Sequence, residues 1–249
     1  MSAAAWRRAS GARPHVYGHR GVRGERTENT MPAFERAADL GADGVELDVR
    51  LCGSGEIVVH HDEDLARTTG GRDTRAVAAL AWDDLAQVEL EDGDRVPQLR
   101  EVLAWARDAR MRVNVEIKRD VPDRGALVRA VARVLAAQPE ADAWLLVSSF
   151  DPALVAYFAW LVPRIPCGLL VEAERPWLAA GWPAALVRAD AVHPEASLVT
   201  PARLARWHAA GRAVNVWTVD DPTTMERLAA LGVDGIVTDV PGLARQVLG

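Results

Sequence analysis

The stretch Leu40-Gly-Ala-Asp-Gly-Val-Glu-Leu-Asp-Val49 recurs near the end of the chain as Leu231-Gly-Val-Asp-Gly-Ile-Val-Thr-Asp-Val240, with six of ten positions identical. Each copy has the pattern of a helix end, a capping glycine, a buried strand, and an aspartate at the carboxyl end of that strand. This pattern is typical of parallel α/β proteins, and its presence near both ends of the chain favours a closed barrel. A shared preference of such loops for Gly-x-Asp-Gly explains the repeat more simply than duplication of a half-barrel.

Outside this stretch, short apolar runs alternate with longer amphipathic ones. Eight runs are expected to be parallel strands: His15–His19, Gly44–Val49, Val113–Ile117, Leu145–Ser149, Pro166–Leu170, Ala189–His193, Ala213–Trp217 and Gly235–Thr238. Helical patterns lie between them, for example at Gly125–Ala137, Pro201–Ala210 and Pro222–Leu231. The sequence therefore predicts an α/β fold, a (β/α)8 TIM-type barrel.

A further apolar run, Ile57–His60, follows the second strand too closely for a parallel crossover, which needs about a dozen residues. It is expected to fold back at Gly53-Ser54-Gly55 as a β-hairpin over the barrel mouth. The long connection from Glu63 to Val96 is expected to form a lid-like insertion or a side wall. We expect residues 1–12 to be a flexible tail and residues 13–249 to be a single barrel domain.

Composition and charge place the chain among ordinary globular proteins. Of its 249 residues, 49% are hydrophobic and 26% are charged, which excludes a disordered or disulfide-stapled chain. The net charge of −6 argues against nucleic acid as a partner. We recognise no secretory signal and no apolar run of bilayer length, so we expect a cytoplasmic protein without stable membrane insertion. The two cysteines, Cys52 and Cys167, are expected to be reduced thiols.

Three acidic side chains are predicted to converge at the carboxyl ends of the strands, where such barrels carry their chemistry. Glu46 and Asp48 are two residues apart on one strand, so both face the lumen. Glu116 and Lys118 repeat this spacing on the next parallel strand. Converging carboxylates repel one another unless a cation or protons neutralise them, and hard oxygen ligands suit Mg²⁺ or Ca²⁺. A divalent metal is the favoured interpretation, and salt bridges to Lys118 and Arg20 are the alternative.

Two histidines are expected at the same mouth, His19 at the end of the first strand and His61 at the end of the hairpin. Because Mg²⁺ and Ca²⁺ avoid imidazole, both histidines are free to act as general acid and base. His193 ends another strand and has no assigned role. The remaining histidines lack such a setting and are expected to be structural or on the surface: His15, His60 and His208.

Eight motifs follow one another along the chain: His19-Arg20-Gly21, Glu28-Asn29-Thr30, Glu46-x-Asp48, His61-Asp62 with Arg67-Thr68-Thr69, Glu116-x-Lys118, Ser149-Phe150, Asn215-x-Trp217-Thr218 and Gly235-Ile-Val-Thr-Asp239. Taken together and in this order, they closely resemble the glycerophosphodiester phosphodiesterase family. The resemblance runs from about residue 15 to the C-terminus. The chain departs from the family pattern at Thr27, where proline is usual, and at Gly53-Ser54-Gly55, where a Lys-Asp-Gly-like turn is usual.

The resemblance implies hydrolysis of a small-molecule glycerophosphodiester to glycerol 3-phosphate and an alcohol, with the glycerol 2-hydroxyl as a possible first nucleophile. The implied site consists of a divalent metal on Glu46, Asp48 and Glu116, an acid/base pair of His19 and His61, and Arg20 with Lys118 on the phosphate. Asn29 is interpreted as a substrate contact or as the N-cap of the first helix. Trp217 is interpreted as an aromatic wall for glycerol or as barrel packing.

Three other functions stay open on the sequence. A lysophospholipase D-type hydrolase would use the same site on lipid phosphodiesters. An aldolase would use Lys118, the only lysine of the chain, as a Schiff base. A binding barrel without catalysis is the non-enzymatic alternative, and the intact histidines and carboxylates count against it. The sequence indicates neither a head group nor an oligomeric state.

Overall fold

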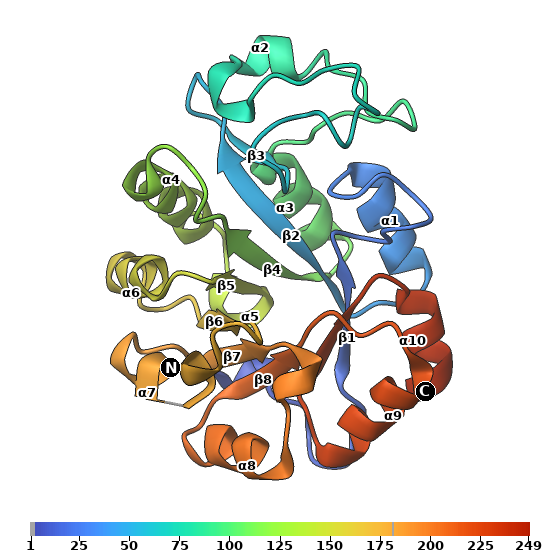
Figure 1. Cartoon of the computed structure of the whole chain (residues 1–249), viewed down its shortest axis with the longest axis vertical. Helices are drawn as coiled ribbons and strands as arrows, with labels where there is room; N and C mark the ends of the chain where they lie inside the picture. The colour runs from blue at the N-terminus through green and yellow to red at the C-terminus, as the bar shows by residue number, and fades with distance from the viewer. Residues whose placement is uncertain (1–2, 181) are drawn as a thin grey trace.

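The computed structural model of the chain describes residues 3–180 and 182–249. Eight parallel strands form a closed barrel with helices around the outside (Figure 1). In barrel order the strands are β1 (His15–His19), β2 (Gly44–Leu51), β4 (Arg112–Ile117), β5 (Leu145–Ser149), β6 (Cys167–Val171), β7 (Ala191–Pro194), β8 (Ala213–Val216) and β9 (Gly235–Thr238). The barrel closes because β1 pairs with both β9 and β2. The predicted (β/α)8 barrel is confirmed, with strand ends shifted by one or two residues.

Helices follow the strands around the barrel (Figure 1). The longer ones are α1 (Met31–Asp39), α3 (Leu99–Asp108), α4 (Arg124–Ala136), α6 (Pro152–Leu161), α8 (Pro201–Ala209), α9 (Pro222–Leu231) and α10 (Pro241–Leu248). The short ones are α2 (Trp82–Leu85), α5 (Ala141–Trp144), α7 (Trp182–Leu186) and the 3-10 helices η1 (Ala3–Trp6), η2 (Val77–Ala79), η3 (Pro176–Ala180) and η4 (Ala196–Leu198). Proline at the first position of α6, α8, α9 and α10 suits the first helical turn, which needs no amide donor there.

The aspartate of each Gly-x-Asp-Gly stretch ties its strand to the neighbouring strand. Asp43 Oδ2 accepts a 2.7 Å hydrogen bond from the Val16 amide of β1. Asp234 Oδ2 accepts a 2.8 Å hydrogen bond from the Val214 amide of β8. Asp190, which lies outside the repeat, makes the same kind of contact with the first amide of β6 at 3.1 Å. The aspartate of the repeat is therefore explained by this hydrogen bond between an αβ loop and the neighbouring strand, without a duplicated half-barrel.

The second glycine of each stretch makes room for Tyr17 in the lumen. A Cβ atom on Gly44 would lie 2.9 Å from the Tyr17 ring, and one on Gly235 would lie 2.8 Å from it. Distances this short are not tolerated between carbon atoms, so both positions require glycine as long as Tyr17 occupies the lumen.

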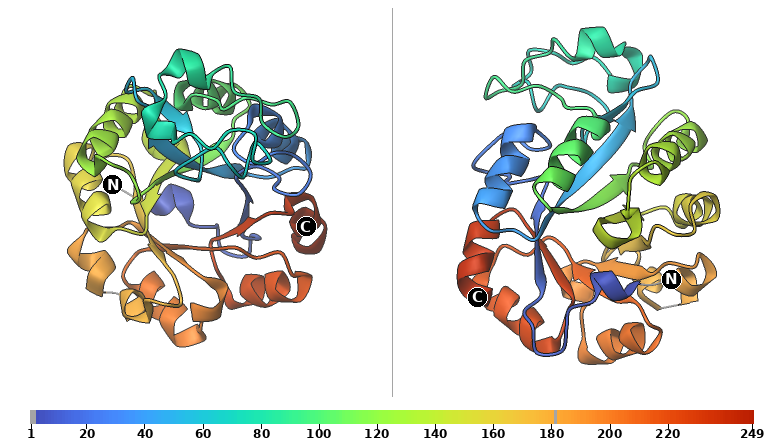
Figure 2. Two further views of the ribbon diagram at one scale, coloured as in Figure 1. Left: turned by 45° about the horizontal axis from the view of Figure 1, so that its top comes forward. Right: turned by 180° about the vertical axis from the view of Figure 1, so that it is seen from behind.

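Aromatic side chains fill the amino-terminal end of the lumen. Trp6 of η1 is completely buried and stacks on Tyr17, with ring centroids 5.8 Å apart. Arg112 donates a 2.6 Å hydrogen bond to the Ala5 carbonyl and lies over the Trp6 ring. The right-hand view of Figure 2, from behind, shows η1 lying across the strands. The expected flexible tail over residues 1–12 is therefore wrong for residues 3–6, which form η1 and bury Trp6 at the end of the barrel. Residues 1 and 2 lie outside the described part of the chain.

The predicted hairpin is confirmed: β3 (Ile57–Val59) runs antiparallel to the end of β2, with Val49 opposite Val59. The connection that follows, from Glu63 to Val96, lies beside the mouth at the top of Figure 1. It packs on the hairpin in an apolar cluster separate from the main core, made of Cys52, Val58, Leu65, Val77, Leu80, Leu85, Val88, Leu90 and Val96. This segment therefore forms a side wall of the mouth.

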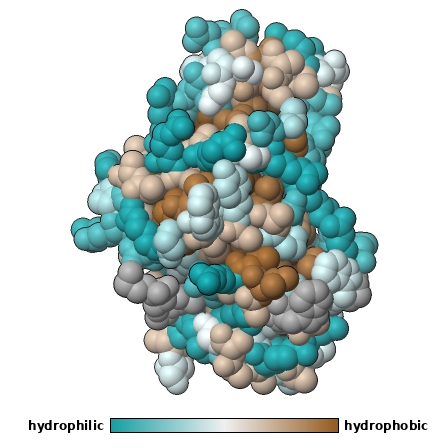
Figure 3. All heavy atoms as spheres, turned by 90° about the vertical axis from the view of Figure 1, so that its left-hand side faces the viewer, coloured by the Kyte–Doolittle hydropathy of each residue, from teal (hydrophilic) through white to brown (hydrophobic). Residues whose placement is uncertain are grey.

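On the outside, the most exposed of the large apolar side chains that the structure describes are Trp160 of α6 and Leu186 of α7, with 75% and 76% of their surface accessible. Figure 3 faces this side of the molecule and shows hydrophobic residues among hydrophilic ones. Trp160 is near the carboxyl end of α6, which lies at the opposite end of the barrel from the mouth because helices and strands run in opposite directions. None of the helices that the structure describes is long and apolar enough to cross a membrane.

Candidate active site

Three carboxylates meet at the mouth of the barrel. Glu46 and Asp48 of β2 and Glu116 of β4 each offer an oxygen within 4.8 Å of the others. All three side chains are buried. The neighbours Leu47 and Val49 point to the outer core instead, as alternation along a strand requires. The structure thus brings together the three residues that the sequence analysis selected as metal ligands.

Two cations neutralise part of this charge. Lys118 Nζ lies 2.9 Å from Glu116 Oε1 and 3.2 Å from Asp48 Oδ1. Arg20 Nε lies 3.2 Å from Asp48 Oδ2. No lysine or arginine of the described residues pairs with Glu46, whose nearest basic side chain is His19 with Nε2 at 4.0 Å. Salt bridges, the alternative to a metal, are therefore present, but they do not reach Glu46, whose Oε2 accepts only a 3.3 Å hydrogen bond from the Arg20 amide within the described part of the chain.

The pKa values at the triad show the same shortage of positive charge. Burial, together with Asp48 and Glu116, raises the pKa of Glu46 well above its usual range. Burial also raises the pKa of Glu116. The pKa of Asp48 is lowered, because Lys118 and Arg20 outweigh the effect of burial. A cluster in which two of three carboxyl groups favour protonation has room for a further cation, and its oxygen donors are those that Mg²⁺ and Ca²⁺ prefer.

Each mouth histidine is oriented by an aspartate. His19 Nδ1 lies 2.6 Å from Asp239 Oδ1, and His61 Nδ1 lies 2.6 Å from Asp62 Oδ1. Both imidazoles line the cavity that Glu46 also lines. A carboxylate at Nδ1 favours the proton on that nitrogen, which leaves Nε2 for chemistry. Sequence reasoning gave Asp239 no role, although an aspartate at the carboxyl end of a barrel strand is a signal for one.

Ion pairs between arginines and Glu28 connect the loop after β1 to the side wall. Buried Glu28 accepts 2.8 Å and 2.6 Å hydrogen bonds from Arg20 and Arg67 and also pairs with Arg23 at 3.1 Å. These contacts outweigh burial and lower the pKa of Glu28 to about 2. Arg67 Nε also lies 2.7 Å from Asp62 Oδ2. The network thus fixes Arg20 and the partner of His61 in one arrangement.

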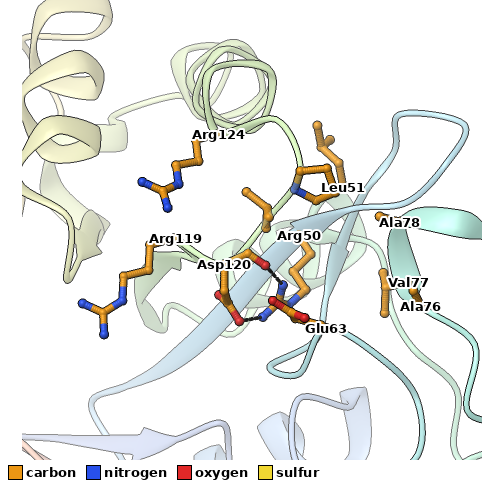
Figure 4. Close-up of a pocket in the computed structure, with 11 residues that line it drawn as sticks. Arg50, Leu51, Glu63, Ala76, Val77, Ala78, Arg119, Asp120 and Arg124 are labelled. Carbon is orange, nitrogen blue, oxygen red and sulfur yellow. Dashed lines mark hydrogen bonds and ion pairs between the residues drawn. The ribbon is translucent and has the colours of Figure 1, made fainter.

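Arg50, two residues beyond Asp48 on β2, holds the backbone of His61. Its Nε and Nη2 donate to the His61 carbonyl at 2.9 and 2.7 Å, and its Nη1 donates to the Asp120 carbonyl at 2.8 Å. Figure 4 shows Arg50 pointing to Asp120 in a second cavity of about 340 Å³, with Arg119 directed away. Arg50 thus links the hairpin to the segment that follows β4. An arginine within a buried strand was the signal that sequence reasoning missed.

Asn29 supports Asp48. Its backbone is left-handed, with φ of 58°, and its Nδ2 donates a 2.9 Å hydrogen bond to Asp48 Oδ2. Its side chain is buried and is not part of the cavity lining. The alternative that Asn29 caps the first helix is wrong, because the Thr30 hydroxyl accepts the hydrogen bond from the Ala33 amide and α1 follows it.

Trp217 forms a wall of the cavity at the end of β8. Its Nε1 donates a 2.6 Å hydrogen bond to the His193 carbonyl, and its ring stands edge-on to Phe150 with centroids 5.3 Å apart. The cavity has a volume of about 290 Å³. Charged residues of the mouth form its upper part, and Asn114, Leu170, His193 and Val237 also line it. Its size suits a small molecule.

Lys118 is poorly suited to Schiff-base chemistry. Burial would lower its pKa, but Asp48 and Glu116 outweigh burial and raise the pKa above its usual range. A Schiff-base lysine needs a lowered pKa to be nucleophilic. The fold and this site, with carboxylates, cations and paired histidines around one cavity, therefore define a hydrolytic barrel enzyme.

Comparisons with known proteins identify the family. The family model described as glycerophosphoryl diester phosphodiesterase family matches residues 19–243. The glycerophosphodiester phosphodiesterase of Caldanaerobacter subterraneus subsp. tengcongensis is 32% identical over 234 residues, which cover 91% of this chain and 94% of that protein. The chain belongs to the glycerophosphoryl diester phosphodiesterase family and is a phosphoric diester hydrolase.

Solved structures give the same fold. A phosphodiesterase of Oleispira antarctica, in complex with the product sn-glycerol-3-phosphate, has a TM-score of 0.84 at 26% identity, covering 94% of this chain and 96% of that chain. The glycerophosphodiester phosphodiesterase of Thermotoga maritima has a TM-score of 0.79 at 30% identity, covering 94% of this chain and 98% of that chain.

Proposed function

We propose that the chain hydrolyses glycerophosphodiesters to glycerol 3-phosphate and an alcohol, with Mg²⁺ or Ca²⁺ held by Glu46, Asp48 and Glu116. The observation that carries the proposal is one small cavity lined by acidic, basic and imidazole groups, in a chain of this family. When bound, the cation would polarise the phosphoryl oxygens and offset the charge that grows on them.

Arg20 and Lys118 would bind the phosphoryl oxygens. Both line the cavity, and both have N–H groups beyond those that pair with carboxylates. Lys118 makes two of the three hydrogen bonds that an ammonium group can donate. Charge-assisted hydrogen bonds from these groups strengthen as negative charge develops in the transition state.

His19 and His61 would transfer the protons. One imidazole takes the proton of the attacking hydroxyl, and the other donates a proton to the leaving alkoxide. The attacking group in this proposal is the 2-hydroxyl of glycerol, which forms a cyclic phosphate as the alcohol leaves, and water then opens the ring. Asp239 and Asp62 support both steps, because they stabilise the imidazolium and fix the ring orientation.

A lysophospholipase D-type activity would use the same groups on lipid substrates. It would require an apolar groove that leads from the cavity. The sides of the mouth instead carry Arg23 and Arg67, and their side chains pair with Glu28. The proposal therefore favours water-soluble glycerophosphodiesters.

The test is a product assay on glycerophosphocholine, glycerophosphoethanolamine, glycerophosphoglycerol and lysophosphatidylcholine, each with Mg²⁺ and with Ca²⁺. Glycerol 3-phosphate is measured with a coupled dehydrogenase, and phosphorus NMR identifies which ester bond breaks. We expect glycerol 3-phosphate from the three glycerophosphodiesters. Release of a phosphorylated head group, or no product with either ion, would refute the proposal.

A further inference from the structure

Besides Tyr17, whose hydroxyl also has no partner, the inner face of the barrel carries four buried polar side chains that each have an atom without a hydrogen-bond partner among the described residues. They are Asn114 (Oδ1) on β4, Ser148 (Oγ) on β5, His193 (Nδ1) on β7 and Asn215 (Oδ1) on β8. Each is 3% exposed or less. Unpaired polar atoms are costly in a protein interior, so a group of them in one barrel indicates that a polar ligand or water completes the set.

Two of these residues line the floor of the active-site cavity, which is also formed by apolar Leu170 and Val237. Asn114 lies on the same strand face as Glu116, one step toward the amino-terminal end. His193 is on β7, across the barrel from β4. In the sheet it is the register partner of Leu170 on the neighbouring strand β6. The floor is therefore apolar except for an amide and an imidazole.

The imidazole of His193 is neutral and offers a donor. Burial lowers its pKa to about 3, and no charged group compensates. Its Nε2 lies 3.2 Å from Asn215 Nδ2, which can only donate, so Nε2 accepts this hydrogen bond and the ring proton is assigned to Nδ1. His193 therefore has an unused N–H, and Asn114 has an unused carbonyl oxygen.

A hydroxyl group both accepts and donates a hydrogen bond, so it matches this pair. The phosphate of a glycerophosphodiester would bind at the cations of the mouth, and the glycerol hydroxyl farthest from phosphorus is the terminal one. We propose that the floor of the cavity is a subsite for the terminal hydroxyl of the glycerol group, with His193 donating to this hydroxyl and Asn114 accepting from it. This inference rests on the proposed function.

The subsite has a consequence for specificity. The terminal hydroxyl takes no part in bond breaking, so its contacts act through recognition and positioning. Below the floor the lumen is filled by Tyr17 and Trp6. An ester of this hydroxyl with a fatty acid would have no hydrogen to donate to Asn114, and the filled lumen would leave no room for the acyl chain. The subsite therefore excludes lysophospholipids that are acylated at this hydroxyl.

The experiment compares glycerophosphocholine with an analogue that lacks only the terminal hydroxyl, the phosphocholine diester of the primary hydroxyl of propane-1,2-diol. We expect wild-type kcat/KM to fall about 100-fold or more for the analogue, because a site built to bind a hydroxyl is left with unpaired groups. His193→Ala should lose about as much on glycerophosphocholine but little on the analogue. His193→Asn, whose amide can place a donor near the position of Nδ1, should recover part of the loss.

Equal wild-type hydrolysis of the two diesters would overturn the subsite and leave the proposed function intact. An equal loss on both diesters in His193→Ala would show a structural role only and would also overturn it. If the wild type hydrolyses neither diester, the proposed function fails, and the subsite fails with it. The wild-type comparison needs no variant, so the test does not depend on the folding of His193→Ala.

Discussion

His19 and His61 have the same kind of partner but different surroundings. The side chain of His19 is 13% exposed and that of His61 is 31% exposed. Asp62 is held between His61 and Arg67, which outweigh burial and lower its pKa to about 2. Burial also lowers the pKa of His61. The two imidazoles are therefore suited to different roles in a reaction that needs an acid and a base.

The first prediction separates these roles. His19→Ala and His61→Ala should each lower kcat by about 100-fold or more on a natural glycerophosphodiester, with metal affinity nearly unchanged. On a nitrophenyl phosphodiester of glycerol, whose leaving group needs no proton, only the variant without the general acid should recover. Steady-state kinetics on both substrates and metal titration calorimetry provide the measurement.

Equal recovery of both variants, or full activity of either on the natural diester, would contradict the two-histidine mechanism. Loss of metal binding in one variant would make that histidine a ligand. His208→Ala is a suitable control, because His208 lies outside the cavity and contacts Asp234 at 2.9 Å.

The second prediction concerns the single lysine. Lys118→Arg keeps the positive charge but replaces a compact ammonium with a planar guanidinium, which does not fit between Asp48 and Glu116 without moving them. We expect most of kcat/KM to be lost while the melting temperature changes little. A fully active Lys118→Arg would show that this position needs only a generic cation.

At the scale of elements, much of the fold could be predicted because strand and helix periodicities are local. Val45, Leu47 and Val49 alternate with Glu46 and Asp48, and that alternation alone placed the carboxylates inside the barrel. The short spacing before Ile57 likewise required an antiparallel hairpin.

Contacts between distant segments could not be predicted in this way. The plug formed by Trp6 depends on its stacking on Tyr17 of β1 and on Arg112, which is far away in the sequence. The role of Arg50 depends on where the hairpin brings the His61 carbonyl. Asn29 contacts Asp48 because its backbone is left-handed, and no periodicity signals that conformation.

The third prediction concerns the contact of Asp43 with β1. Burial would raise the pKa of Asp43, but the Arg13 guanidinium and the Val16 amide hold it below its usual range. The ionised carboxylate therefore stabilises the fold above the unfolded-state pKa of about 4, and this stabilisation is lost as the pH falls through the lower folded-state value. Asp43→Asn should lower the free energy of unfolding by about 1–3 kcal/mol at pH 7.

The difference from wild type should shrink as the pH is lowered below about 4, because the wild-type carboxyl group then becomes protonated. Urea unfolding at several pH values measures both effects. Asp108→Asn is the control, because Asp108 pairs with Arg107 on the surface and its side chain is 74% exposed. A difference between Asp43→Asn and wild type that is constant from pH 7 to pH 3 would contradict the assignment.

At the scale of the whole molecule, the barrel separates stability from chemistry. The amino-terminal end of the lumen is closed by aromatic packing. The carboxyl end gathers the buried carboxylates and their cations. A cluster of this kind opposes folding unless its charges are compensated, so a bound cation should also stabilise the protein.

The most direct test of the account is hydrolysis of glycerophosphocholine by enzyme stripped of divalent ions and then supplied with Mg²⁺ or Ca²⁺, beside Glu46→Ala, Asp48→Ala and Glu116→Ala. We predict that chelation abolishes activity, that at least one ion restores it and raises the melting temperature, and that the folded variants stay inactive. Full activity after exhaustive chelation would contradict the account and would leave the salt bridges of Lys118 and Arg20 as the only compensation of the triad.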